Sequence, residues 1–231
     1  MKSPTFGVTR LDGMLTLGRM HHPVRGLLNG AAALASAVGL AVLLSANPGN
    51  LTVAVALAVY AGSLVVMFTV SSLYHSVPWT GRWKQRMRRL DHSAIFLVVA
   101  GTYTPIAVVY LDPVWRNASL IAVWTAAVVG IALKLVERDI RLGPSITLQS
   151  VMGWAAIIPL IRIADRLGGD ALLLLALAGA IYSVGMVFLL TRRPRLFPTV
   201  FSHHELFHVL VVTASLFNFL AILNHVLPAA A

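Results

Sequence analysis

Three short polar clusters interrupt an otherwise apolar chain, and together they hold the residue types of a catalytic zinc site. The clusters are residues 71–75 (Ser-Ser-Leu-Tyr-His), residues 91–92 (Asp-His) and residues 204–208 (His-Glu-Leu-Phe-His). Each lies at the edge of an apolar run long enough to cross a membrane. Ionisable groups are costly there, so by default they indicate function. Three histidines leave a fourth zinc position open for water, and an aspartate can orient that water.

The spacing within two clusters suits a shared site on a helix. His204 and His208 are four residues apart, so a helix places both imidazoles on one face, where they can bind one metal ion. A pair of interfacial histidines without metal is an equally good explanation of this spacing alone. Ser71 and His75 have the same separation. Taken alone, Ser71 is better explained as a packing residue bonded to its own backbone, and His75 equally well as an interfacial side chain.

Asp91 and the remaining histidines have alternative explanations. Asp91 precedes an apolar run, where aspartate is a favoured helix N-cap, so capping and site membership are weighed equally. His92 points about 100° away from Asp91 on a helix, which makes it a neighbour rather than a ligand. His203 likewise lies off the face of His204 and His208. Three further histidines are expected to be interfacial and remote from the site: His21, His22 and His225.

Glu205 lies within a sequence that resembles two different motifs. His204-Glu205-x-x-His208 has the form HExxH, in which zinc proteases use the glutamate as general base. Ser202-x-x-Glu205 has the form of a capping box, in which serine and glutamate bond each other's backbone at a helix start. We favour the capping box for Glu205, and either interpretation keeps the two histidines on one face.

The composition indicates a membrane protein. Of 231 residues, 58% are hydrophobic and 11% charged, against about 25% charged in soluble domains. Mean hydropathy is +0.82. Cysteine is absent, so disulfides are excluded and a metal must be held by His, Asp or Glu. The net charge of +10 needs no nucleic acid to explain it, because the cations lie between apolar runs.

The apolar runs predict an all-α protein with seven transmembrane helices. Most runs hold about twenty residues, which matches the thickness of a bilayer core. We expect a basic N-terminal segment over residues 1–26, followed by one membrane domain over 27–231. Pro159 is expected to bend the fifth helix. The predicted spans are Leu27–Ala46, Leu51–His75, His92–Leu111, Asn117–Val136, Ile146–Ala164, Asp170–Leu190 and Phe201–Leu227.

The distribution of lysine and arginine predicts the orientation. Cations should concentrate on the cytoplasmic side of short loops. Only Arg116, Arg162 and Arg166 fall on the opposite side, which predicts a cytoplasmic N-terminus and an outside C-terminus. His75, Asp91 and His204 then all lie at the cytoplasmic ends of their helices, at one membrane depth. The cations assigned to the cytoplasmic side are Lys2, Arg10, Arg19, Arg25, Arg82, Lys84, Arg86, Arg88, Arg89, Lys134, Arg138, Arg141, Arg192, Arg193 and Arg195.

Three motifs resemble those of the hemolysin III family, the bacterial branch of the progestin and adipoQ receptors, within a wider group of membrane hydrolases. They are SSLYHS (71–76), DHSAIFLVVAGTYTP (91–105) and SHHELFHVLVVTAS (202–215). The resemblance implies a seven-helix bundle with zinc near the cytoplasmic ends of the second, third and seventh helices. It assigns the zinc ligands to His75, His204 and His208, the residue that holds the zinc-bound water to Asp91, and a supporting role to Ser71.

The first helix departs from the family pattern. Members often carry Glu, Asn and His at successive spacings of three and four residues. Here Asn29 matches the asparagine, but Gly26 and Ala33 stand in the other two places. This departure argues against a contribution of the first helix to the site.

These observations favour a zinc-dependent hydrolase of a lipid amide, ceramide-like by analogy with the family's eukaryotic relatives. Three neutral imidazoles leave a position for water, and Asp91 would orient that water and move its proton. The expected partner is a membrane lipid, and the expected location is the plasma membrane as a multi-pass protein. One alternative is a non-enzymatic sensor, receptor-like or cytolysis-associated protein with structural zinc. Another is an intramembrane zinc protease that uses Glu205.

Overall fold

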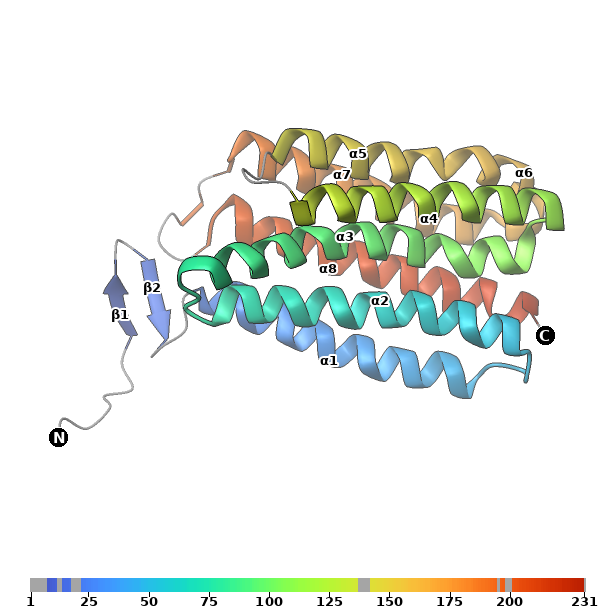
Figure 1. Ribbon diagram of the computed structural model, residues 1–231. Coiled ribbons are helices and arrows are strands. Elements are labelled where there is room, and N and C mark those ends of the chain that lie inside the picture. The colour runs from blue at the N-terminus through green and yellow to red at the C-terminus, as the bar shows by residue number, and fades with distance from the viewer. Residues whose placement is uncertain are drawn as a thin grey trace.

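The computed structural model is a bundle of long helices preceded by a short pair of strands (Figure 1). It describes residues 8–11, 14–17, 22–136, 142–194, 196–197 and 201–230. The strands pair antiparallel, with Val8 opposite Leu17 and Leu11 opposite Met14. The elements are β1 (Val8–Leu11), β2 (Met14–Leu17), α1 (Pro23–Ser45), α2 (Leu51–Ser76), α3 (Gly81–Tyr110), α4 (Pro113–Val136), α5 (Leu142–Ala155), α6 (Ile157–Leu167), α7 (Gly169–Thr191), α8 (His203–Ala221), the π-helical turn η1 (Ile222–Val226) and the 3₁₀ turn η2 (Pro228–Ala230).

Seven helical segments in the described part are long and apolar enough to cross a membrane, as predicted. Many of their large apolar side chains face outward, among them Leu34 on α1, Ile121 on α4 and Leu173 on α7. Such side chains would be unfavourable in water and are suited to contact lipid. The protein is therefore an integral membrane protein that crosses the bilayer several times.

Polar residues in the short connections determine where several helices start. The Asn50 side chain accepts hydrogen bonds from the backbone amides of Thr52 and Val53 and so caps α2. Asp112 does the same for α4 through the amides of Val114 and Trp115. These caps satisfy amide groups that have no partner within the helix.

The fifth membrane segment is interrupted near the predicted proline. It consists of α5 and α6, which meet at Ala156. Pro159 has no amide hydrogen, and its ring would clash with the carbonyl of Ala155 in a regular helix. The break at Ala156 therefore has a local cause, and it lies within one turn of the proline that was expected to disturb the fifth helix.

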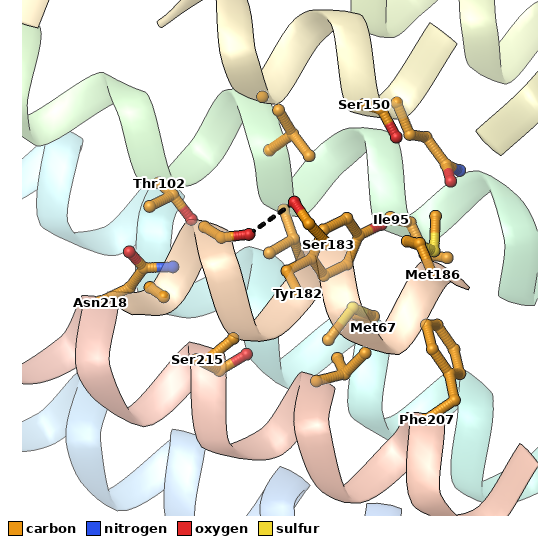
Figure 2. Close-up of a pocket in the computed structure, with 18 of the residues that line it drawn as sticks. Met67, Ile95, Thr102, Ser150, Tyr182, Ser183, Met186, Phe207, Ser215 and Asn218 are labelled. Atoms are coloured by element: carbon orange, nitrogen blue, oxygen red, sulfur yellow. Dashed lines mark hydrogen bonds between the residues drawn. The ribbon is translucent and has the colours of Figure 1, made fainter. Parts of the chain in front are cut away.

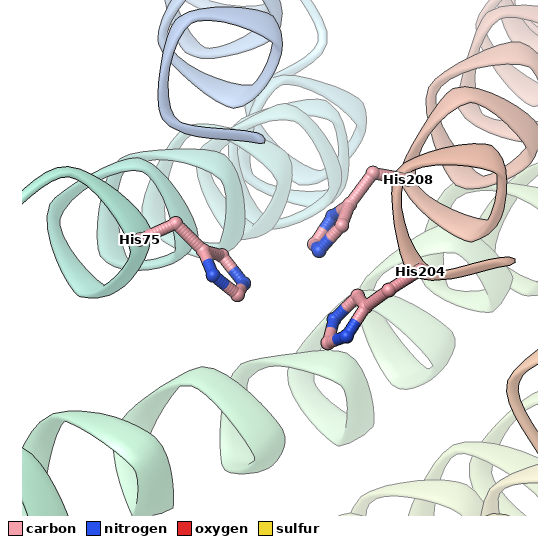
Figure 3. A group of neighbouring side chains, drawn as sticks. All are labelled: His75, His204 and His208. Carbon is pink, nitrogen blue, oxygen red and sulfur yellow. The ribbon is translucent and has the colours of Figure 1, made fainter. Parts of the chain in front are cut away.

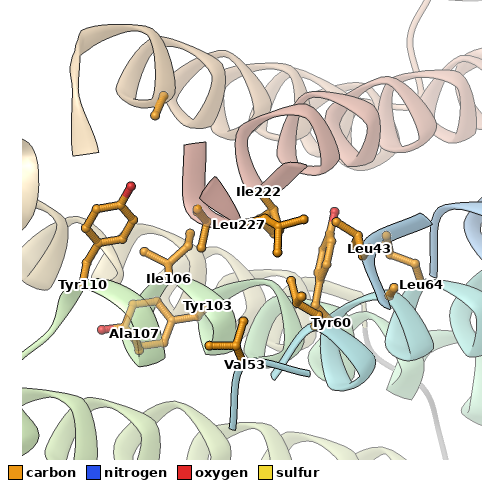
Figure 4. Packing of buried hydrophobic residues seen from close by; sticks show 14 of the residues in the cluster. Leu43, Val53, Tyr60, Leu64, Tyr103, Ile106, Ala107, Tyr110, Ile222 and Leu227 are labelled. Carbon is orange, nitrogen blue, oxygen red and sulfur yellow. The ribbon is translucent and has the colours of Figure 1, made fainter. Parts of the chain in front are cut away.

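The helices pack in an order that brings α2, α3 and α8 together. α1 packs against α2, α2 against α3, and α7 against α8, while α1 also reaches α8. A buried apolar cluster joins α2, α3 and η1 (Figure 4), with Tyr60, Ile106 and Ile222 among its members. This cluster lies toward the end of the bundle where α2 begins. We call the opposite end, where α2 finishes and α8 begins, the histidine end.

Candidate metal centre and adjoining cavity

The last turns of α2 bring Ser71 and His75 into the interior at the histidine end. The Ser71 side chain is buried, and His75 is only 3% exposed. The backbone amide of His22 donates to the His75 carbonyl over 2.9 Å, so the segment preceding α1 is fastened to the end of α2. His75 therefore lies in a well-defined position.

The first turns of α8 position His204 and His208, and a capping box fixes where α8 starts. The Glu205 carboxylate accepts from the Ser202 amide at 2.9 Å and from the Ser202 hydroxyl at 3.0 Å, both through Oε2. The favoured capping interpretation is confirmed. The two imidazoles, one turn apart, stack with centroids 5.1 Å apart and an interplanar angle of 8°.

His75 closes this pair into a group of three (Figure 3). Its ring lies nearly perpendicular to the others, with centroids 5.4 Å from that of His204 and 4.9 Å from that of His208. One ring nitrogen from each residue can be chosen so that all three lie within 4.8 Å of one another. α2 and α8 thus bring together residues separated by more than half of the chain.

The donors in this group fit a metal ion such as zinc. Both ring nitrogens of His75 and Nε2 of His208 are buried and have no hydrogen-bond partner. Buried polar atoms rarely lack a partner, and such exceptions call for an unseen ligand or a functional role. Neutral imidazoles are common zinc ligands, and a set of three leaves a further coordination position.

Asp91 reaches the same region from α3, but not as a helix N-cap. α3 begins at Gly81, ten residues before Asp91, so capping, one of the two equally weighted explanations of Asp91, is excluded. The basic segment 82–89 extends the helix toward its N-terminus, beyond the apolar run. Because this extension is charged rather than apolar, hydropathy did not indicate where the helix begins. The Asp91 carboxyl is hydrogen-bonded to the Ser71 hydroxyl. This contact joins α3 to α2 beside the histidines.

α1 contributes more to the site than the sequence led us to expect. Nδ2 of Asn29 donates to the Arg25 carbonyl and lies 3.1 Å from Nδ1 of His208. Nε of Arg25 donates to Oε1 of Glu205 over 2.6 Å. The departure at Gly26 and Ala33 therefore does not remove the first helix from the site. In the sequence, the asparagine in the first apolar span was the available sign that α1 contributes to the site. Arg25 was used only to predict the orientation of the protein in the membrane.

The other histidines are placed partly as expected. His22 was predicted to be remote, yet its ring centroid is 6.0 Å from that of His75, so that prediction is wrong. The hydrogen bond from the His22 amide to the His75 carbonyl holds His22 at this position. His92 and His203 line the neighbouring cavity. His225 lies in η1 at the other end of the bundle, as expected, and His21 lies outside the described residues.

A cavity of about 520 Å³ extends from the histidines into the bundle. His204, His208, Asp91 and Ser71 line it at the histidine end. Farther in, the walls are mainly apolar and come from several helices, as Met67, Ile95 and Met186 illustrate (Figure 2). Thr102, Ser215 and Asn218 add polar groups at the deeper end. The cavity is large enough for part of a lipid or another small amphipathic molecule.

The family model described as Haemolysin-III related matches residues 20–219, which include the site and six complete membrane segments. The chain belongs to this family. It is 31% identical over 208 residues to Hemolysin-3 from Bacillus cereus, covering 88% of this chain and 91% of that protein. It is 32% identical over 184 residues to a Hemolysin-3 homolog from Bacillus subtilis (strain 168), covering 79% and 82%. As a haemolysin-III-related protein, the chain matches these relatives over most of their length.

Proposed function

We propose that this haemolysin-III-related protein is a zinc-dependent hydrolase that cleaves an amide bond in a membrane lipid. The observation that carries the proposal is a group of three histidines, two of them buried, beside a largely apolar cavity that is also lined by Asp91 and Ser71. A catalytic metal site needs an open ligand position, a nearby proton carrier and a space for substrate. These residues provide candidates for all three.

His75, His204 and His208 would hold the zinc ion. When bound, zinc supplies a nucleophile derived from water and polarises a carbonyl group. The Asp91 carboxylate would accept a proton and pass it to the leaving amine. The Ser71 hydroxyl, bonded to that carboxyl, would hold it in one orientation. Asn29 would fix the His208 ring through Nδ1, a type of contact that commonly orients metal-binding histidines.

A lipid substrate fits the surroundings of the site. The cavity lies within a membrane bundle, and apolar side chains form most of its wall. The acyl chain of a lipid could lie against these apolar side chains, with the amide group of the lipid beside the histidines. We place the site at the cytoplasmic face of the plasma membrane, because the positive charges concentrate at the histidine end.

Glu205 is poorly suited to the protease alternative. One carboxylate oxygen accepts from Arg25 and the other from Ser202. A general base must reach water with a free oxygen. Here Oε1 is engaged in the contact between α8 and α1, and Oε2 in the capping box of α8. We therefore assign Glu205 to structure rather than to proton transfer.

Metal content provides the first test. Detergent-purified wild-type protein should contain near-stoichiometric zinc by mass spectrometry. His75→Ala and His208→Ala should both lose it, because each removes a ligand from a different helix. His225→Ala, at the other end of the bundle, is the matched control and should retain zinc. Folded wild-type protein without metal would refute the proposal.

Turnover provides the second test. Zinc-loaded protein should release fatty acid from an N-acyl lipid, as measured by chromatography. Asp91→Asn should keep its zinc but lose activity by on the order of 10²–10⁴-fold, the usual contribution of a positioned proton carrier. Full zinc occupancy with no turnover of any N-acyl lipid would instead favour a structural metal in a non-enzymatic membrane protein.

A further inference from the structure

Two arginines line the cavity at the histidine end, and the described chain provides neither with an acidic partner. Arg88 lies one turn before Asp91 on α3, and Arg192 directly follows the last residue of α7. The ion pair found among the described residues joins Arg25 to Glu205 instead. Two cations therefore border the cavity, and the residues that the structure describes give neither an ion pair.

The position of Arg88 points to an absent acceptor. Its Nε is buried and has no hydrogen-bond partner. Asp91 shares a helix face with Arg88, yet its carboxyl bonds Ser71 and forms no ion pair with the guanidinium. The positive-inside rule explains why an arginine lies at this end of the bundle, but not why its Nε is buried without a partner. Arg88 as a whole is half-buried, and an oxyanion that accepts the parallel N–H groups of a guanidinium would provide its Nε with the missing partner.

Arg192 has an uncommon backbone conformation for its residue type. Its φ of 54° lies in the left-handed region at the C-terminal end of α7. Glycine is favoured there, because a side chain at positive φ is disfavoured sterically. The arginine keeps this conformation and places a second cation at the cavity. α7 ends and α8 begins at the histidine end, so this cation lies near the start of α8.

We propose that Arg88 and Arg192 form an anion subsite for the phosphate headgroup of a lipid whose apolar part occupies the cavity. The inference rests on the proposed function, since that lipid would be the hydrolase substrate: an amide lipid that carries a phosphate. Guanidinium groups match phosphate geometry and remain charged at every physiological pH. The three imidazoles add no competing negative charge, and Asp91 is the acidic residue beside them in the cavity lining.

Headgroup selectivity tests the subsite directly. Full-length protein in nanodiscs is titrated with a fluorescent N-acyl lipid phosphate and with the same lipid bearing an uncharged hydroxyl. The phosphate form should bind at least tenfold more tightly in the wild type. Arg88→Gln and Arg192→Gln should each lower its affinity by about tenfold, the effect of one lost charged hydrogen bond. Affinity for the uncharged lipid should not change.

A control variant and a competitor separate the subsite from general attraction to positive charge. Arg82→Gln removes a charge from the exposed start of α3 and should preserve selectivity. Equal affinity of the wild type for both lipids, or an equal loss in Arg82→Gln, would overturn the proposal. Inorganic phosphate should compete only at concentrations at least a hundredfold above the lipid. Competition as strong as that of the lipid would instead assign the site to a free anion.

The zinc content, the turnover and the headgroup selectivity of the wild type, taken together, separate this inference from the proposed function. If zinc and turnover prove absent from the wild type while phosphate selectivity persists, the hydrolase proposal fails and the subsite stands. If wild-type protein turns over N-acyl lipids without distinguishing the two headgroups, the subsite fails and the hydrolase stands. Thermal unfolding of each arginine variant, followed by tryptophan fluorescence, verifies that it remains folded.

Discussion

At the residue scale, the histidine group depends on neighbours that hold each ring in place. Asn29 lies against Nδ1 of His208 and is 1% exposed, so it has no access to water as an alternative partner. Asn29→Ala should weaken zinc binding by about 10- to 100-fold, the usual effect of losing a group that orients a ligand. Competition with a fluorescent chelator measures this affinity.

Asn117 on α4 provides the matched control for that experiment. It is exposed and lies at the start of α4, away from the site. Asn117→Ala should bind zinc like the wild type. An Asn29→Ala protein with unchanged zinc affinity would show that the His208 ring is held by packing alone.

The buried pair of Arg25 and Glu205 should matter for stability rather than for chemistry. Their side chains are 11% and 9% exposed. Glu205→Gln keeps the shape but leaves the Arg25 charge without its counter-ion, which should cost about 1–3 kcal/mol of unfolding free energy. Chemical denaturation in detergent measures this loss, and zinc content should stay unchanged. Abolished turnover with unchanged stability would instead support a general base at position 205.

The site was predictable where helix spacing determined it and unpredictable where packing did. The separation of His204 and His208 fixed a shared face, and the capping box followed from Ser202 and Glu205. Residue type alone could not place Arg25 beside Glu205, because that contact depends on how α1 packs against α8. His22 likewise lies close to His75 because its backbone amide donates to the His75 carbonyl. A hydrogen bond between backbone groups cannot be predicted from residue types.

At the element scale, close contact between α3 and α4 requires a glycine. A Cβ at Gly130 would lie 2.5 Å from Cε1 of Phe96, whose side chain is 1% exposed. The ring cannot easily move within the core, so Gly130→Ala should destabilise the protein by about 1–3 kcal/mol. Thermal unfolding in detergent measures the change.

Gly62 on α2 provides a control in which alanine should not lower the stability. A Cβ there would meet nothing within 4 Å. Alanine is favoured over glycine in a helix by up to about 1 kcal/mol, so Gly62→Ala should leave stability equal or raise it. If both variants behaved alike, helix propensity rather than the Phe96 contact would dominate at Gly130.

The elements themselves were predicted well because membrane helices follow from apolar length. The seven spans and the effect of Pro159 required only hydropathy and the geometry of proline. The start of α3 was misjudged, because a basic amphipathic extension lacks an apolar signal. The pairing of β1 with β2 also had no clear pattern in the short N-terminal segment.

At the scale of the whole molecule, the odd number of membrane segments in the described part predicts that the chain before α1 and the chain after α8 lie on opposite sides of the membrane. The charge distribution predicts that the histidine end faces the cytoplasm. The chain has no cysteine, so single-cysteine variants report accessibility without background. Thr80, between α2 and α3, marks the histidine end, and Pro48, between α1 and α2, marks the other end; both are exposed.

An impermeant maleimide should label Pro48→Cys in intact cells and Thr80→Cys only after permeabilisation. Labelling of Thr80→Cys in intact cells, with Pro48→Cys protected, would reverse the orientation. The outcome also bears on chemistry, since it determines which compartment exchanges metal, water and released amine with the cavity. A histidine end that faced outward would remove the charge-based reason for placing the proposed hydrolysis at the cytoplasmic face.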